Sequence, residues 1–299
     1  MKEKTLRLLF AILALFGMDY GLDSFLKKGL DKGLGLDQHS KVLIVGHSHL
    51  MMGLDREMME KELHCKVTKH TRSGVGMAER YLMTKMYLDS PFSDSLKVVI
   101  IGVDPFSFNG SGLSENSYML FYPWMDQREI GKFIKDATDP ATYYAHKVFR
   151  TSRYSDDLIK QSIRGWRNDD RNYKTTIFTD SLFEANRGKW IRPILFDKGL
   201  MDKLDSTIMI CTDRGLNVIL LQTPILNVLT NMYNEEYRKI IAYYQSLDEK
   251  SEKVTFLNYC TDYEEQHNLY FDPIHLNRNG QILITQKCIE DIIKTRLNE

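Results

Sequence analysis

The sequence predicts an α/β protein with a three-layer α/β/α architecture: a five-stranded parallel sheet, preceded by an N-terminal hydrophobic helix and interrupted by a mostly helical insertion. Two observations favour this class. Five short runs are predicted strands, and runs such as KVLIVG and LKVVIIGVD are rich in Val, Ile and Leu without polar alternation, which is typical of strands buried on both faces. These runs alternate with segments whose apolar residues recur at helical spacing, which predicts parallel strands joined by crossover helices.

The strands and helices of the first third follow one another directly. KVLIVG (41–46) predicts the first strand, and LMMGLDREMMEKELH (50–64) predicts one helix after it. CKVTKH (65–70) is expected to form the second strand. A helix over 74–88 and a third strand over 96–104 follow, the latter with the highest β propensity in the chain.

The same alternation resumes after residue 196. It predicts a helix over 198–215, a strand over 217–224, a helix over 232–250, a strand over 253–259 and a final amphipathic helix over 280–297. Gly215 is expected to end the helix before the fourth strand. Asn279 is expected to cap the last helix.

Residues 105–196 interrupt this pattern and hold all three tryptophans, Trp124, Trp166 and Trp190. Long structureless loops are uncommon inside a compact domain, so we expect a mostly helical insertion over one end of the sheet. Its aromatic residues suit stacking on sugar rings. The alternative is a small satellite core.

The N-terminal segment 1–27 carries an apolar run from Leu8 to Met18. This run is shorter than the roughly 20 residues of a transmembrane helix, but Tyr20, Leu22 and Phe25 extend it if two aspartates are tolerated. We expect an uncleaved membrane anchor; the alternatives are a removed signal peptide and an amphipathic helix packed on a cytosolic domain. Residues 28–40, with three glycines, are predicted to be a linker to a single domain over 41–299.

Charge and cysteine usage exclude several functions. Forty Lys and Arg residues balance forty Asp and Glu residues, so no global field draws the chain to nucleic acid, and we expect no such partner. The four cysteines show no C-x-x-C spacing, which argues against a zinc site. The loop after the first strand lacks the glycine cluster of a nucleotide binder. No cofactor and no metal are therefore expected.

Ser48 stands where the first strand turns into the first helix, within Gly46-His47-Ser48-His49. Backbone N–H groups at a helix N-terminus stabilise an anion, so the Ser48 N–H could hold an oxyanion while its hydroxyl attacks. The alternative is that Ser48 only caps the helix. His47 and His49 are expected to line the same site.

A second chemical feature lies in YFDPIHLNRNG, after the fifth strand. Asp272 and His275 are three residues apart in a turn stiffened by Pro273. This spacing lets the carboxylate accept from one imidazole nitrogen while the other faces a nucleophile, the arrangement of a hydrolytic triad. Ser48 and these two residues all follow predicted strands at the edge of the sheet where active sites form.

Three blocks of the sequence resemble the SGNH, or GDSL-like, hydrolase family, whose fold is flavodoxin-like. GHSHLMMGLD resembles the nucleophile block, with Ser48 in the nucleophile place and His47 where the family has Asp. SGVGM is similar to the second block, which implies an oxyanion-hole N–H from Gly74, with Gly76 in reserve. DPIHLNRNG is similar to the last block and implies Asp272 and His275 as the other triad members.

The third block departs from the family pattern. The family has G-x-N-D after the third strand, whereas this chain reads Gly102-Val103-Asp104-Pro105. An ionised Asp104 cannot donate to an oxyanion and would repel it. Asn109 or a group from the insertion is the candidate for a replacement donor. The alternatives are that Asp104 has another role or that the protein is a weak catalyst.

The hydrophobic helix, the G-x-D-P variant and the insertion resemble a membrane-anchored branch that acts on cell-envelope polymers. The resemblance implies a serine esterase or acyltransferase that acts on acyl esters of a cell-envelope glycan, with acetyl as the favoured acyl group. It implies an acylated carbohydrate substrate, a membrane acyl-transfer partner, and a catalytic domain held in the periplasm, or secreted if the N-terminal segment is cleaved. The alternative is a weak or inactive member that binds glycan or supports an acylation system.

Overall fold

The chain divides into two compact units in a computed structural model, which describes residues 2–110, 116–179, 181, 184–185 and 192–295. The helical unit comprises residues 1–34 and 115–169. The sheet unit comprises residues 35–114 and 170–299. Residues 115–169 of the predicted insertion therefore form one compact unit with the N-terminal segment, while the flanking described residues belong to the sheet unit.

The sheet unit confirms the predicted α/β class, with five parallel strands in the order β2-β1-β3-β4-β5. The strands are β1 (Val42–Gly46), β2 (Val67–Thr71), β3 (Val98–Gly102), β4 (Asn217–Gln222) and β5 (Val254–Asn258). The chain reverses direction across the sheet between β1 and β3. In doubly wound sheets this switch point, at the carboxyl ends of the strands, is where ligands bind.

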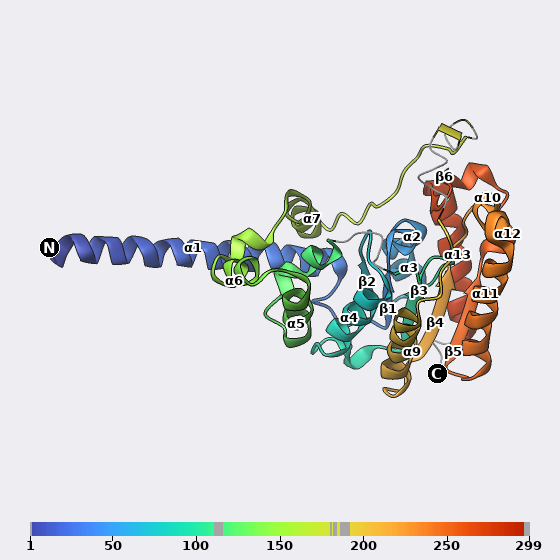
Figure 1. Cartoon of the computed structure of the whole chain (residues 1–299), viewed down its shortest axis with the longest axis horizontal. Helices are drawn as coiled ribbons and strands as arrows, with labels where there is room; N and C mark the ends of the chain where they lie inside the picture. The colour runs from blue at the N-terminus through green and yellow to red at the C-terminus, as the bar shows by residue number, and fades with distance from the viewer. Residues whose placement is uncertain (1, 111–115, 180, 182–183, 186–191, 296–299) are drawn as a thin grey trace. The chain divides into compact units, whose positions relative to one another are not determined.

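Helices cover both faces of this sheet (Figure 1). They are α2 (Ser48–Gly53), α3 (Arg56–Leu63), α4 (Met77–Leu88), α9 (Lys198–Thr212), α10 (Asn227–Thr230), α11 (Asn234–Glu249), α12 (Cys260–Tyr263) and α13 (Arg278–Thr295). On one face, Ile44 and Ile100 pack with Leu50, Met59 and Ile284 of α2, α3 and α13. Strand residues alternate between faces, so the buried odd-numbered positions of β1 and β3 face α4, α9 and α11.

Two helix boundaries differ from the prediction. The helix expected over 50–64 is two helices, because Leu54 is extended and the Asp55 side chain accepts from the N–H of Met58, which starts α3. The last helix begins at Arg278 rather than at residue 280. Its cap is Asn277, not Asn279, because Asn277 Oδ1 accepts from the N–H groups of residues 279 and 280.

The helical unit is built on one long helix, α1 (Lys2–Leu34). The other elements are η2 (Ser117–Trp124), α5 (Arg128–Ala137), α6 (Pro140–Val148), η3 (Arg150–Arg153) and α7 (Asp156–Trp166). They gather along the C-terminal half of α1, and its N-terminal half projects free of them (Figure 1). Trp124 and Trp166 contact α1 through Asp31 and Phe25, whereas Trp190 lies outside the described residues.

Part of the predicted linker is instead a helix–helix interface. α1 continues through Leu34, and Gly29 and Gly33 lie one turn apart on the side that meets Gly165 of α7. A Cβ atom on Gly165 would lie 1.8 Å from the Gly29 carbonyl oxygen and 2.8 Å from the Gly33 nitrogen. The glycines are therefore required for close backbone approach, the G-x-x-x-G mode of helix packing, rather than for flexibility.

Replacing Gly165 with Ala is expected to loosen the α1–α7 pair by about 1–3 kcal/mol, because the new methyl group has no space. Faster amide hydrogen exchange in α7 would report this. Gly17→Ala is the matched control, since a Cβ there meets nothing within 4 Å. Unchanged exchange in the Gly165 variant would contradict the interface.

α1 is long and apolar enough to cross a membrane over Glu3–Leu34, and its most apolar stretch is not buried in protein. Leu6, Phe10 and Leu13 are 67%, 74% and 62% exposed. An amphipathic helix packed on a domain would bury the apolar side chains of one face, whereas these three side chains are exposed.

Candidate active site

The site begins with the turn that follows β1. Ser48 is the first residue of α2, and His47 is the N-cap, its Nδ1 accepting from the N–H of His49 at 3.1 Å. The alternative that Ser48 only caps the helix is therefore wrong. Because the first residues of a helix have no intrahelical acceptor, the Ser48 N–H remains available to an anion.

A tight hairpin near the C-terminus supplies the other two predicted triad residues. β6 (Tyr270–Asp272) pairs antiparallel with β7 (His275–Leu276), and Asp272 lies opposite His275. Asp272 Oδ1 accepts from the N–H groups of Ile274 and His275, each at 2.9 Å. The turn thus fixes the carboxylate, and its Oδ2 lies 2.8 Å from His275 Nδ1.

The fold brings this hairpin to the start of α2. His275 Nε2 lies 2.8 Å from Ser48 Oγ. The imidazole is held between the stacked ring of Phe271, at 5.4 Å between centroids, and the ring of His49, at 5.3 Å and nearly perpendicular. With Nδ1 donating to Asp272, Nε2 is left to accept the Ser48 hydroxyl proton, as in a hydrolytic triad.

Behind the nucleophile turn lies a buried polar network centred on Asp104. The Asp104 carboxylate makes a very short contact with His47 Nε2 and accepts from Ser107 Oγ at 3.1 Å. It also accepts from the N–H of Phe106 at 2.6 Å, and Arg80 lies 3.9 Å away. His47, Asp104 and Arg80 are each at most 2% exposed.

The hydrogen bonds determine how this network is protonated. His47 Nδ1 accepts a backbone hydrogen bond, so the proton of the neutral ring is on Nε2 and is donated to Asp104. Burial and the charge of Arg80 lower the pKa of His47, in keeping with a neutral ring. Burial alone would raise the pKa of Asp104, but contacts with His47, His49 and Arg80 hold it far below its usual value. Asp104 is therefore ionised and balanced by Arg80.

The structure shows which groups Asp104 and Asn109 bind. Asp104 is turned toward donors of its own and acts as the anchor of His47. Asn109 holds segment 193–195 in place, because its Nδ2 donates to the Pro193 carbonyl at 2.8 Å and its Oδ1 accepts from the N–H of Leu195 at 3.0 Å. The second N–H of its amide remains a candidate donor, and Asn109 lines the pocket beside His47.

The glycines of SGVGM separate into two roles. Gly74, in the turn after β2, has φ +80°, a conformation that glycine adopts without strain. Gly76 is the N-cap of α4, and its N–H donates to the Glu79 carboxylate at 3.0 Å. The amide of Gly76 is therefore occupied, which favours Gly74 as the second oxyanion donor.

His47, His49 and Asp104 form a cluster whose potential ligand atoms lie within 4.8 Å of one another. Both nitrogens of His47 already take part in hydrogen bonds, and the Arg80 guanidinium beside Asp104 repels a cation. The donor set therefore fits a hydrogen-bonded network better than a metal site.

A pocket of about 310 Å³ adjoins the nucleophile turn. Its polar lining includes His47, Arg80, Asp104, Asn109 and Arg192. Phe106, Pro193 and Leu195 supply apolar surface. This volume lies at the lower end of the range for small-molecule sites.

Arg80 and Ser107 are site residues that the sequence interpretation did not include. The available signal was the spacing of Arg80 with Met77, Met83 and Tyr87, which places an arginine on the buried face of α4. A charge in such a position requires a buried partner, which Asp104 provides.

Buried histidines of the sheet unit make stability depend on pH. Burial and the charge of Arg72 lower the pKa of His70 in β2 from 6.5 to about 3. Between these values only the unfolded chain binds the proton, so stability present above pH 6.5 falls as pH drops, by about 3 kcal/mol at pH 4.5. We therefore expect His70→Gln to weaken the pH dependence of the urea unfolding midpoint between pH 6.5 and 4.5, whereas substitution of the exposed His64 should leave it unchanged. The same decrease of the midpoint with falling pH in wild type and in the His70 variant would refute this.

No protein-family model matches the chain, and a search of curated proteins finds no match either.

Proposed function

We propose that this protein is a serine esterase or acyltransferase that acts on acyl esters of a cell-envelope glycan. The observation that carries the proposal is the continuous hydrogen-bonded chain from Ser48 Oγ through His275 to Asp272, with both links at 2.8 Å. The resemblance of the three sequence blocks to SGNH hydrolases supports the same assignment.

In the first half-reaction, Ser48 Oγ attacks the acyl carbonyl and His275 Nε2 takes its proton. Asp272 stabilises the resulting imidazolium, and the N–H groups of Ser48 and Gly74 hold the oxyanion. Collapse breaks the ester bond, and His275 returns the proton to the leaving sugar hydroxyl. In the second half-reaction, His275 deprotonates water or an acceptor hydroxyl, which attacks the acyl-serine and releases an acid or a new ester.

Access to the nucleophile favours a small acyl group. Ser48 is only 7% exposed, which suits acetyl better than a long chain. The adjoining pocket, with Arg192 and Asn109 in its lining, offers room for part of a sugar. The apolar α1 is consistent with anchoring to a membrane, and Lys2, Lys4 and Arg7 before it favour a cytoplasmic N-terminus and a periplasmic catalytic unit.

A fluorophosphonate probe tests the proposed chemistry directly. The full-length protein in detergent is treated with the probe, and the labelled peptide is identified by mass spectrometry. We expect one adduct, on Ser48, and no adduct after unfolding in urea. Folded protein that takes up no label would refute the proposal.

The second candidate is an SGNH-like protein that binds glycan without turning it over. The observation that favours it is that the ionised Asp104 carboxylate, which stands where the family has Asn, cannot donate to an oxyanion. Loss of one such donor typically costs about 10²–10³ in rate. Glycan binding by a protein that the probe does not label would favour this alternative.

A further inference from the structure

The uninterrupted apolar run of α1, from Leu8 to Met18, is by itself shorter than the hydrocarbon core of a bilayer. Near the end of this run the Phe16 ring stacks on that of Phe149, at 6.1 Å between centroids. From Lys4 to Gly17 the helix rises only about 20 Å, against a hydrocarbon core of about 30 Å. A complete span must therefore include the next turns of α1, with Asp19 and Asp23.

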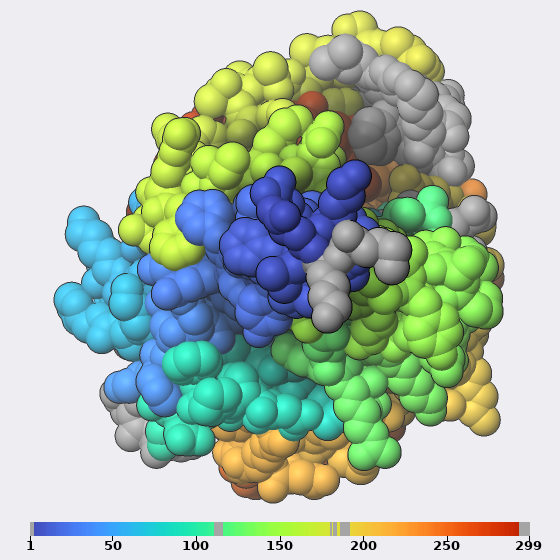
Figure 2. Space-filling view, turned by 90° about the vertical axis from the view of Figure 1, so that its left-hand side faces the viewer, coloured from blue at the N-terminus to red at the C-terminus, as the bar shows by residue number. Residues whose placement is uncertain are grey.

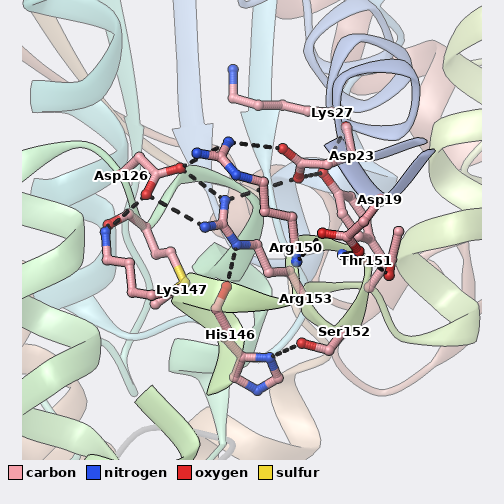
Figure 3. Close-up of polar contacts among 12 residues, drawn as sticks. Asp19, Asp23, Lys27, Asp126, His146, Lys147, Arg150, Thr151, Ser152 and Arg153 are labelled. Atoms are coloured by element: carbon pink, nitrogen blue, oxygen red, sulfur yellow. Dashed lines mark hydrogen bonds and ion pairs between the residues drawn. The ribbon is translucent and has the colours of Figure 1, made fainter. Parts of the chain in front are cut away.

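Both aspartates are provided with donors from the segment after α6 (Figure 3). Asp19 accepts from the N–H groups of Arg150 and Thr151 at 2.8 and 2.9 Å, and from the Thr151 hydroxyl at 2.5 Å. Asp23 accepts from the Tyr154 hydroxyl at 2.7 Å and from Arg150 at 3.3 Å. Hydrogen bonding of this kind lowers the cost of placing a carboxylate near lipid.

The charges around these aspartates also balance. Asp126 accepts from Lys147 at 2.8 Å and from Arg153 at 2.9 Å, and Arg150 lies 3.4 Å from it. Arg153 is also 3.9 Å from Asp23. The cluster thus pairs Asp19, Asp23 and Asp126 with Lys147, Arg150 and Arg153, leaving no net charge to oppose approach to a low-dielectric layer.

Large apolar side chains stand exposed beside this neutral cluster. Tyr144, Val148 and Phe149 at the end of α6 are 57%, 51% and 50% exposed. Tyr20 of α1 is 57% exposed, and the Arg150 guanidinium lies 4.7 Å from its ring centre. Figure 2 looks toward the N-terminal end of α1 and shows the green to yellow-green segment of this unit beside the blue helix.

We propose that Tyr20, Tyr144, Val148 and Phe149, here termed the apolar collar, lie in the interfacial layer of a lipid bilayer. The collar continues the apolar surface of α1 at the point where the uninterrupted apolar run of the helix ends. Tyr side chains are enriched at this depth, where the ring contacts acyl chains and the hydroxyl reaches water. This inference rests on the proposed membrane anchoring by α1.

Photocrosslinking of the full-length protein tests the collar. p-Benzoylphenylalanine replaces Tyr144 or Phe149, and the protein is reconstituted into phosphatidylcholine–phosphatidylglycerol vesicles containing radiolabelled lipid. We expect lipid adducts at both positions. Met119 of η2 is the matched control, because it is 45% exposed in the same unit. Met119 lies in η2, where Trp124 Nε1 donates to Asp31 of α1. Asp31 is about 18 Å further along the helix than Asp19, so we expect no lipid adduct at Met119.

A photocrosslinking probe at Phe10 distinguishes membrane anchoring by α1 from the interfacial position of the collar. Lipid adducts at Phe10 but none at Tyr144 and Phe149 would overturn the collar while leaving the anchor intact. An absence of adducts at all three positions would overturn both. Adducts of Tyr144 and Phe149 to another protein would overturn the collar in favour of a protein interface.

Discussion

Ser48→Ala is expected to lower ester hydrolysis by roughly 10⁴–10⁶, because no other group at this position can form the acyl intermediate. Initial rates with p-nitrophenyl acetate, corrected for the uncatalysed reaction, would measure this. Ser95→Ala, at an exposed position of the sheet unit, should retain full activity. Residual activity above a few per cent in the Ser48 variant would mean that another group carries the chemistry.

The same assay distinguishes the role of Asp272. Asp272→Asn keeps the shape of the hairpin but favours the wrong tautomer of His275, and kcat should fall by about 10⁴. The members of a catalytic triad act as a unit, so we expect the double variant with Ser48→Ala to be scarcely worse than Ser48→Ala alone. Additive losses would contradict a shared mechanism.

Arg80→Met is expected to destabilise the sheet unit by about 3–5 kcal/mol, because it leaves the ionised Asp104 buried without its counter-charge. Arg80 also donates to the Gly102 carbonyl at 2.7 Å, so the end of β3 loses a contact as well. Urea unfolding of the full-length protein in detergent would measure the change.

Two further variants separate this effect from a general intolerance of substitution. Adding Asp104→Leu to Arg80→Met should recover part of the lost free energy of unfolding, because two apolar side chains then replace a buried carboxylate without its counter-charge. Lys239→Met, in the exposed pair with Glu235, should leave the unfolding midpoint nearly unchanged. An Arg80 variant as stable as wild type would show that Asp104 does not depend on this charge.

The sequence was sufficient to predict the sheet and to select the three residues of the candidate triad. Parallel strands such as VLIVG and VVIIG are buried on both faces, so their composition alone distinguishes them from surrounding segments. Asp272 and His275 are neighbours in one turn, and their geometry is therefore local. Their meeting with Ser48 could be expected because both segments follow strands at the same sheet edge.

The residues around the nucleophile could not be predicted in the same way. The expectations that an ionised Asp104 would repel an oxyanion and that Asn109 could replace the missing donor came from comparing positions in a motif. In the structure the role of each side chain follows from contacts with residues far away in the chain. Asp104 contacts His47 and Arg80, and Asn109 donates to the Pro193 carbonyl. Long-range contacts of this kind leave no periodic pattern.

By itself the sequence determined the α/β class, the apolar N-terminal helix and the candidate triad, because each depends on composition or on spacing over a few residues. Only the tertiary structure decided that Gly29 and Gly33 pack a helix rather than loosen a linker. It also decided that Asp104 supports the nucleophile turn, and that Asp19 and Asp23 within an apolar helix receive donors from η3. The physical reason is that a glycine or a buried charge acquires its role from the groups packed against it, and in these cases those groups belong to distant segments of the chain.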